Sequence, residues 1–336
     1  MDKKAAEAYI YAKASGIIGK SFVDSRSADI FEAKSLTDLW TLIFRTPAPA
    51  IPEIMLAERI EKEAFKRFVD QYTYFVSLYD KPDQILIDQL FIYESENLKA
   101  IGSALCAGDK ECPHLINFGK FSQLNYKAWP DVAKITAKSP YSWYDHVPSI
   151  HEQQSLEFKI DLQVIRHLWK AIQKTTGETR IQLEDLYLNE YCIKNIVWAL
   201  RLKINYKWDK DKIIKNLIYV TDSPSASDPI AGPAIQILNK ETDVYEQWAD
   251  WKYRALLNPH VAGEVWSVQP SWIERKNRVR MGKLASHVFH AYPMSTVALI
   301  GWYKMKNFEM SCIRTAVESL RMGISSQDAK DAVGIN

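Results

Sequence analysis

The fold is decided by residues 82–108, which read PDQILIDQLFIYESENLKAIGSALCAG. Pro82 suits the first position of a helix, where its missing N–H costs nothing, and Gly108 suits the left-handed residue that ends one. The apolar side chains between them recur at spacings of three, four and seven, which places them in one stripe of a helix. They are Ile87, Phe91, Leu98, Ile101 and Leu105. The stretch therefore predicts one long helix with a buried face.

The same pattern returns twice further along the chain. Near the C-terminus it is complete, with Glu309 at the place of Glu94 and Gly323 closing the helix. The middle copy keeps the stripe, but Cys192 stands where the glutamate would be, and Asn195 corresponds to Asn97. The apolar members of the two later copies are Trp302, Met305, Ile313, Ala316 and Leu320, and Leu188, Ile196 and Ala199. Units this far apart are whole helical domains rather than solenoid repeats.

Glu94 and Glu309 lie inside apolar stripes, so both are predicted to be structural carboxylates shielded from water. A buried carboxylate is costly unless it is paired or hydrogen-bonded. We therefore expect each of them to meet a cation or a helix N-terminus from a neighbouring element.

The composition indicates a globular chain without a strong electrostatic field. At 336 residues it has room for two or three domains, and 47% hydrophobic and 12% aromatic residues exclude a disordered chain. Its 43 basic and 41 acidic residues nearly cancel, which does not favour nucleic acid or acidic membranes as general partners. Four scattered cysteines and no signal peptide predict reduced thiols in a cytoplasm.

No segment alternates apolar and polar residues for long enough to support a sheet, so the predicted fold class is all-α. Two weakly patterned regions, 108–149 and 222–233, suggest domain boundaries. The domains expected are 1–120, 121–221 and 222–336. Helices are predicted at 2–24, after a serine cap at Ser35, and at 53–79, 82–108, 155–176, 181–208, 209–219 and 241–257, followed by the third copy of the stripe.

Two details of this arrangement can be checked directly. The helices at 53–79 and 82–108 are separated by a short turn and are expected to lie antiparallel. The uncharged run from Leu284 to Tyr303 has the length of a membrane span, but it contains histidines, Pro293 and Gly301. We interpret it as a loop followed by a buried helix.

The motifs of catalysis and cofactor binding are missing. Residues 16–21 imitate only the tail of a phosphate-binding loop. Cys106, Cys112 and His114 lack the spacing of a zinc site, and the histidine pairs lack an accompanying acid. We therefore predict no catalytic residue, cofactor, metal or small-molecule substrate.

The densest basic run extends from Glu274 to Lys283 and is the candidate partner interface. Such a run could contact phosphate, lipid headgroups or an acidic partner, although an ordinary solvated helix face is the commoner explanation. Two nearby tryptophans could anchor the same interface. The candidate residues are Trp266, Trp272, Arg275, Lys276, Arg278, Arg280 and Lys283.

These repeats resemble the family of C subunits of the V-type and A-type ATPases, whose eukaryotic members are called d subunits. The resemblance rests on 94–99 (ESENLK), 189–196 (NEYCIKNI), 303–314 (YKMKNFEMSCIR) and the opening 9–13 (YIYAK). It spans nearly the whole chain, but each motif is short. The sequence departs from the family where Cys192 replaces an acid, and where residues 15–17 lack the usual arginines.

The resemblance implies a funnel of three similar helical domains around a pseudo-threefold axis. Such a subunit sits on the membrane proteolipid ring, receives the central stalk in its hollow and links the two without catalysis. It would be peripheral, on the cytoplasmic face of the membrane, in a complex that transports protons or sodium ions. Two alternatives stay open: a cytoplasmic helical-repeat adaptor that binds a protein partner in a groove, and an all-α enzyme with an unrecognised site.

Overall fold

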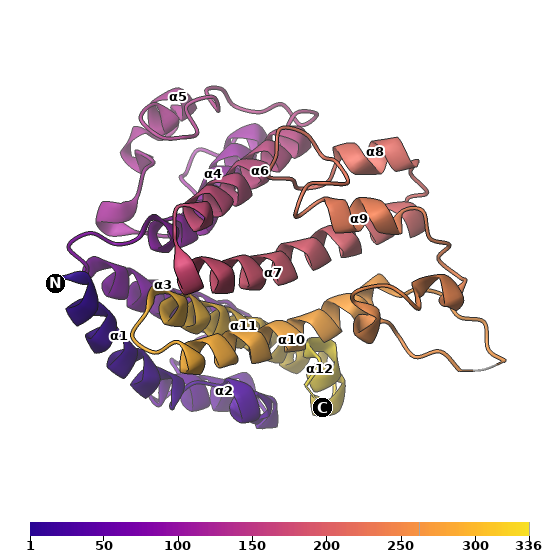
Figure 1. Cartoon of the computed structure of the whole chain (residues 1–336). Coiled ribbons are helices and arrows are strands. Elements are labelled where there is room, and N and C mark those ends of the chain that lie inside the picture. The colour runs from indigo at the N-terminus through magenta and orange to yellow at the C-terminus, as the bar shows by residue number, and fades with distance from the viewer. Residues whose placement is uncertain (262, 336) are drawn as a thin grey trace.

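The structure, a computed structural model, describes residues 1–261 and 263–335. Within these ranges the chain is built from helices and contains no strand, which confirms the all-α prediction (Figure 1). The α-helices are α1 (Lys3–Ile18), α2 (Leu36–Phe44), α3 (Glu53–Ser77), α4 (Gln84–Ala107), α5 (Val132–Thr136), α6 (Gln153–Gln173), α7 (Gly177–Ile204), α8 (Lys210–Lys215), α9 (Gly232–Ile237), α10 (Pro270–Ala291), α11 (Thr296–Met322) and α12 (Ser326–Val333). Short 3-10 helices lie at Asp24–Glu32, Gly119–Phe121, Tyr126–Ala128, Tyr245–Trp248 and Arg254–Leu256.

The ends of the helices follow local sequence signals. Ser35 caps α2 as predicted, since its Oγ accepts a hydrogen bond from the Asp38 amide at 3.1 Å. Gly108 and Gly323 end α4 and α11 in the left-handed conformation, with φ of 80° and 66°. Pro82 lies just before α4 rather than at its first position, because Asp83 occupies the capping position.

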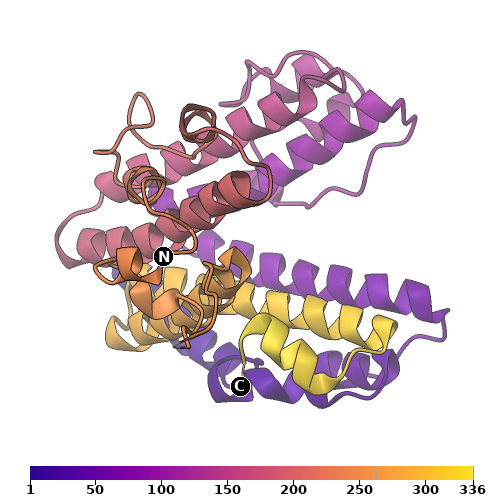
Figure 2. The ribbon, with the colours of Figure 1, turned by 90° about the vertical axis from the view of Figure 1, so that its right-hand side faces the viewer.

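The long helices pair in a cyclic order. The three that carry the repeated stripe are α4, α7 and α11, and each packs against the first long helix of another pair: α4 on α6, α7 on α10, and α11 on α3. Figure 2 shows α4 and α6 in one body and α3 and α11 in the other. The expected antiparallel packing of α3 on α4 is therefore wrong. The two helices diverge from their connection because each finds its apolar partner elsewhere.

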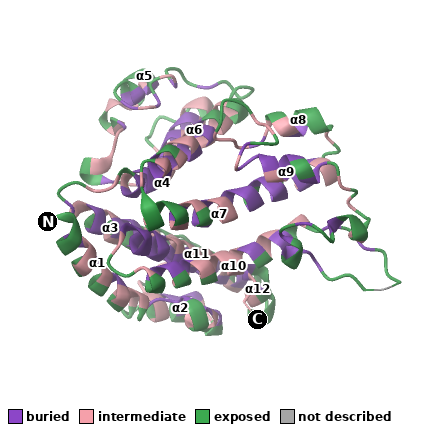
Figure 3. Ribbon diagram, viewed as in Figure 1, coloured by how far each residue is buried: buried purple, intermediate pink, exposed green. Residues whose placement is uncertain are grey.

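The buried apolar residues form two clusters. The larger one contains residues of helices α1 through α6, of the first part of α7, of the C-terminal half of α10, and of α11 and α12. The smaller one extends from Ile193 to Ile273 and includes Trp248 and Trp266. The inner faces of α3, α7 and α11 are buried, whereas α8 and the outer turns are largely exposed (Figure 3). The division into three domains and the funnel remain predictions.

Two segments of the C-terminal third differ from expectation. The prediction of a helix at 241–257 is wrong. The described chain there forms two short 3-10 helices, because the aromatic rings pack on one another. Trp248 and Trp251 meet edge to face at 5.3 Å, and the Trp248 indole donates to the Glu241 carbonyl. The sequence analysis did not predict helix α10. This helix has few buried positions, and the basic residues between them weaken the periodic apolar pattern.

The uncharged run 284–303 contains the end of α10, a short connection and the start of α11. The buried helix expected in this run is therefore confirmed. The loop expected before it is largely the last part of α10. Among the described residues, no helix combines the length and apolar character needed to cross a membrane.

Helices α10 and α11 approach so closely that a glycine is needed between them. A Cβ added at Gly301 would lie 2.8 Å from the Ala285 carbonyl oxygen and 3.0 Å from the Phe289 amide nitrogen. Gly301→Ala should therefore lower the free energy of unfolding by about 1–3 kcal/mol, because backbone atoms cannot move aside easily. Denaturant unfolding would measure this loss.

Gly16→Ala is the matched control, because nothing lies within 4 Å of the added methyl group in α1. It should be neutral or stabilise by up to about 1 kcal/mol, the helix propensity difference between glycine and alanine. Equal effects of the two substitutions would contradict the close approach of α10 and α11.

Candidate functional site

Glu94 is buried in α4 and holds the segment that follows Phe121. Its side chain is 2% exposed, and its Oε1 accepts hydrogen bonds from Ser122 Oγ (2.7 Å), Gln123 N (2.6 Å) and Leu124 N (2.9 Å). The expected donor was a cation or a helix N-terminus, and the structure supplies loop amides instead. A carboxylate that accepts backbone N–H groups satisfies donors that the loop could not otherwise pair.

Glu309 plays a similar role in α11, but with a cation beside it. It is 5% exposed, and its Oε1 accepts from the Phe22 amide at 2.7 Å, so it joins α11 to the segment after α1. Lys306, one turn earlier on the same helix, donates to its Oε2 and to Ser21 Oγ. The cation thus comes from the glutamate's own helix rather than from a neighbouring element.

The middle copy of the repeat keeps the asparagine and takes its acid from elsewhere. Asn97 exchanges two hydrogen bonds with the backbone of Ile116, both 2.8 Å, and Asn195 does the same with Ile218 at 2.6 and 3.0 Å. Cys192, in the place of the glutamate, donates its thiol to the Pro229 carbonyl. The sequence correspondence of Asn97 and Asn195 is therefore also a correspondence of contacts.

Asp228 supplies the buried carboxylate beside Cys192, and sequence reasoning missed it. It is 2% exposed and accepts from the amides of Val220, Thr221, Ile230 and Ala231. Burial alone would raise the pKa of Asp228, but these backbone donors outweigh it and lower the pKa. The signal was weak, because an aspartate among serines and prolines is typical of a loop.

The candidate interface residues on and near α10 do not form one patch. Trp266 was expected at the surface but lies in the core. It is 5% exposed, and its indole N–H donates to the Asn258 carbonyl within the smaller cluster. Arg275 and Lys276 flank the ring of Trp272, with their charges 5.1 and 5.4 Å from its centroid. These three residues share one side of α10.

The remaining cations of the run point elsewhere. Arg280 is held internally, since it donates to Asn189 Oδ1 at 2.9 Å and lies over the ring of Tyr253. Lys283 is exposed at the edge of a different hollow. Arg278 lines a cavity between α7, α10 and α11, whereas Arg275 and Lys276 line a smaller hollow beside Trp272.

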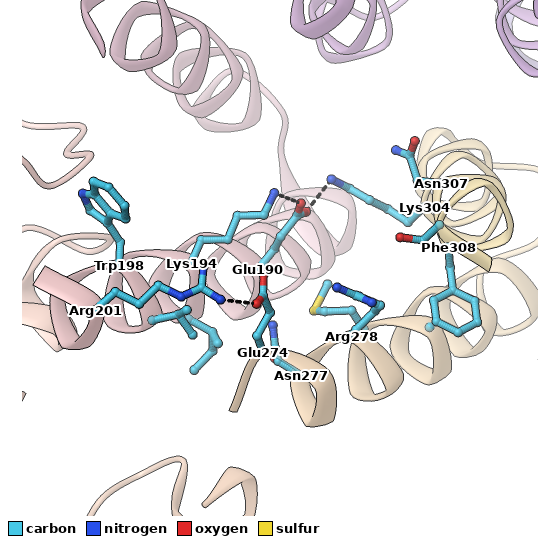
Figure 4. A pocket seen from close by; sticks show the side chains of 15 residues that line it. Glu190, Lys194, Trp198, Arg201, Glu274, Asn277, Arg278, Lys304, Asn307 and Phe308 are labelled. Atoms are coloured by element: carbon cyan, nitrogen blue, oxygen red, sulfur yellow. Dashed lines mark hydrogen bonds and ion pairs between the residues drawn. The ribbon is translucent and has the colours of Figure 1, made fainter. Parts of the chain in front are cut away.

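This cavity of about 500 Å³ lies between α7, α10 and α11 (Figure 4). Its size is typical of sites that accept a small molecule or a few side chains of a partner. Trp198, 40% exposed, lies on its α7 side. The apolar members of its lining are Ile193, Val197, Trp198, Met281 and Phe308, and the charged ones are Glu190, Lys194, Arg201, Glu274, Arg278 and Lys304.

Glu190 lies between two ammonium groups in this cavity, as Figure 4 shows. Lys194 is 2.7 Å from its Oε1, and Lys304 pairs with its Oε2. Burial would raise the pKa of Glu190, but the two cations outweigh burial and lower the pKa to about 2. Lys304 has one carboxylate that it shares with Lys194, so for Lys304 burial dominates and lowers the pKa.

The other ion pair of the cavity joins the two walls formed by α7 and α10. Arg201 and Glu274 meet at 2.6 Å, with side chains that are 37% and 44% exposed. The part of the chain that the structure describes contains no cluster of three or more His, Cys, Asp or Glu residues suited to a metal ion. The arrangement can bind and position a partner group, and it presents no activated nucleophile with an adjacent base.

The comparisons with known proteins cover the chain almost from end to end. A family model described as ATP synthase (C/AC39) subunit matches residues 10–332. A protein of Treponema pallidum (strain Nichols), described as an uncharacterized protein, is 26% identical over 341 residues, which is 99% of this chain and 98% of the relative.

The two buried glutamates should differ in what their removal costs. Glu94→Ala leaves loop amides unpaired and should lower the free energy of unfolding by about 1–3 kcal/mol. Glu309→Ala also leaves Lys306 buried without its carboxylate, so its cost should be about 3–5 kcal/mol. Denaturant unfolding would measure both.

Two further variants act as controls for this prediction. Cys192→Ala should be tolerated better than either glutamate substitution, because it removes a thiol with one weak contact. Adding Lys306→Met to Glu309→Ala should recover part of the loss. The pairing argument fails if Glu309→Ala costs no more than Cys192→Ala.

The acid sensitivity of the protein should depend on Glu190. Because its folded pKa of about 2 lies below the ordinary value of 4.5, it stabilises the fold above pH 4.5, and this contribution is lost as the pH falls through 2. The contribution at neutral pH is at most about 3 kcal/mol, because the lowered pKa of Lys304 offsets part of it. Unfolding curves of the wild type and Glu190→Gln should differ at neutral pH and converge near pH 2; a constant difference would contradict this.

Proposed function

Because the chain belongs to the ATP synthase (C/AC39) subunit family, we propose that it links the central stalk of a V-type or A-type ATPase to the membrane proteolipid ring. Membership of the family makes it a subunit of such an enzyme, and no helix among the described residues could cross a membrane. In this proposal it is a peripheral, non-catalytic rotor subunit on the cytoplasmic face of the membrane. Its partners are the central-stalk subunits and the ring.

The observation that carries the proposal is the cyclic pairing of the long helices. Each stripe helix packs on the first helix of another pair, and the last pairing, α11 on α3, returns to the beginning of the chain. In this proposal the closed cycle presents three comparable faces to the partner subunits. Three comparable faces suit contact with a ring of identical subunits, where a contact that breaks at one position can form again at the next.

A linker that turns under load must also resist shear within itself. The anchors described above serve this purpose, because Glu94, Asn97 and Asn195 fix loops to long helices through buried hydrogen bonds. Around Trp302 the aromatic rings of α3 and α11 interlock, with Phe75 at 5.2 Å and Phe68 at 5.9 Å between ring centroids. A stiff interior transmits torque to the partner surfaces.

We assign one of these partner surfaces to the cavity between α7, α10 and α11. Its rim offers Trp198 and the cation Arg278, the two residue types most often found at the energetic centre of an interface. Trp272, flanked by Arg275 and Lys276, is a second candidate contact. Specific association generally buries more than about 1,000 Å², so either patch would be part of a larger contact.

The adaptor alternative shares the surface chemistry but differs in its partner. A cytoplasmic adaptor should be isolated together with a soluble protein, whereas a rotor subunit should remain with the membrane complex after mild detergent extraction. Composition of the complex that contains this chain separates the two.

The decisive test is ion transport by membranes that lack this subunit. The head should still hydrolyse ATP, while ATP-driven ion transport disappears, because the stalk is no longer coupled to the ring. Adding the wild-type protein back should restore transport. Proton or sodium flux and phosphate release would be measured on the same membranes.

Add-back of surface variants then tests the assigned contact. Trp198→Ala combined with Arg278→Glu should restore less transport than Lys138→Glu, which changes an exposed lysine outside the cavity. If transport persists fully in the depleted membranes, the chain is no linker, and the adaptor interpretation replaces the proposal.

A further inference from the structure

A second pocket, on the other side of α11, has a charge that the rest of the chain does not share. It encloses about 440 Å³ between α1, α3 and α11, with one contribution from α2. Its charged lining consists of four cations, Lys13, Lys20, Arg67 and Lys306, and one carboxylate, Glu309. The pocket therefore has a surplus of three positive charges, whereas the whole chain has a surplus of two. A concentration of one sign in a hollow attracts the opposite sign.

The cations of this pocket are not neutralised within the chain. Lys306 pairs with Glu309, but among the described residues Lys13, Lys20 and Arg67 form no ion pair. All three are exposed. A single exposed cation costs little free energy because water solvates it. The convergence of three cations from α1, the turn after α1 and α3 on one hollow, however, needs an explanation.

Contacts within the protein account for only part of this arrangement. The Arg67 guanidinium lies 5.1 Å from the Phe44 ring and reaches the Ile43 carbonyl at 3.5 Å, and Lys13 is 5.8 Å from the Tyr9 ring. None of these contacts supplies negative charge. The C-terminal carbonyls of α1 could attract Lys20, but Arg26 already donates to Gly19 O at 2.9 Å.

Buried groups at the base of the pocket still have hydrogen-bonding capacity. Lys306 is 9% exposed, and its ammonium donates to Ser21 Oγ and Glu309, which leaves one of its three protons. Gln71 Oε1 is buried with no hydrogen-bond partner among the described residues. The pocket thus offers a donor and also an acceptor, and an unpaired buried acceptor calls for an N–H or O–H group.

The wall between the cations is apolar. Phe68, Met310 and Ile313 are 1%, 4% and 3% exposed, and Ile17 and Ile43 are half-buried beside them. A bare phosphate would use the cations but would leave the apolar wall and the Gln71 acceptor without partners. A peptide segment has a carboxylate for the lysines, an apolar side chain for the wall and a backbone N–H for Gln71.

We infer that this pocket binds an acidic segment of a partner protein, with a glutamate or aspartate side chain among the cations and an adjacent aliphatic side chain against α3 and α11. The inference rests on the proposed function in one respect: the partner would be another subunit of the ATPase. The pocket chemistry itself is independent of that identity and can be tested on the isolated chain.

The test uses a synthetic fluorescent peptide in which glutamate and leucine alternate. It should bind the full-length protein at low ionic strength, and its affinity should fall as salt is added, because the attraction is between charges near the surface. The double variant Lys13→Glu/Arg67→Glu should weaken binding at least tenfold. The control Lys4→Glu/Lys138→Glu makes the same change in net charge at exposed lysines outside the pocket and should bind as the wild type does.

Two other ligands decide the chemistry of the occupant. A peptide with glutamine in place of glutamate should bind at least tenfold more weakly, and inorganic pyrophosphate should compete poorly. If pyrophosphate binds here and the acidic peptide does not, the pocket takes small oxyanions and the inference is overturned. Equal loss of peptide binding in the pocket and control variants would also overturn it, because net charge alone would then explain the binding.

The outcome is separable from that of the rotor proposal. Thermal unfolding of both double variants should stay close to that of the wild type, since the substituted side chains are exposed and form no ion pair among the described residues. If the peptide binds as expected but depleted membranes still transport ions, the pocket remains and the rotor proposal falls. If transport requires the subunit but the peptide does not bind, the rotor proposal stands and the inference about the pocket is overturned.

Discussion

A carboxylate buried in an apolar helix face must be surrounded by hydrogen-bond donors, and this constraint organises the whole chain. The cost of leaving such a group unpaired exceeds that of most single contacts. Glu94 therefore binds the loop amides of residues 123 and 124, and Glu309 binds the Phe22 amide. These bonds fix α4 to the segment that follows it and fix α11 to a segment near the N-terminus.

The middle repeat shows that the constraint concerns the carboxylate and not its position in the sequence. With Cys192 in the stripe, Asp228 supplies a buried carboxylate from the segment between α8 and α9 and accepts hydrogen bonds from four amides. Asn195 keeps the double hydrogen bond to Ile218 that Asn97 makes to Ile116. In the middle repeat the buried carboxylate thus lies on a loop instead of on the long helix, and Asn195 still connects the helix to the loop backbone.

Charge is balanced over the molecule but not locally. In the cavity between α7, α10 and α11 most charged groups are paired, so Trp198 and the apolar residues give it the character of a site for side chains. In the pocket between α1, α3 and α11 most cations have no carboxylate among the described residues. The two are lined by different residues of α11, so the substitutions that test one leave the other unchanged.

Local sequence was enough to predict the helical class, the long helices other than α10, several of their caps and stops, and the position of Glu94 and Glu309 on apolar stripes. These follow from local spacing and from the conformational preferences of serine, proline and glycine. It did not determine that α3 leaves α4 for α11, that Asp228 replaces the missing acid, or that Trp266 is in the core. Such choices depend on which distant surfaces bury the most apolar area and satisfy the most donors, and those quantities exist only once the chain has folded.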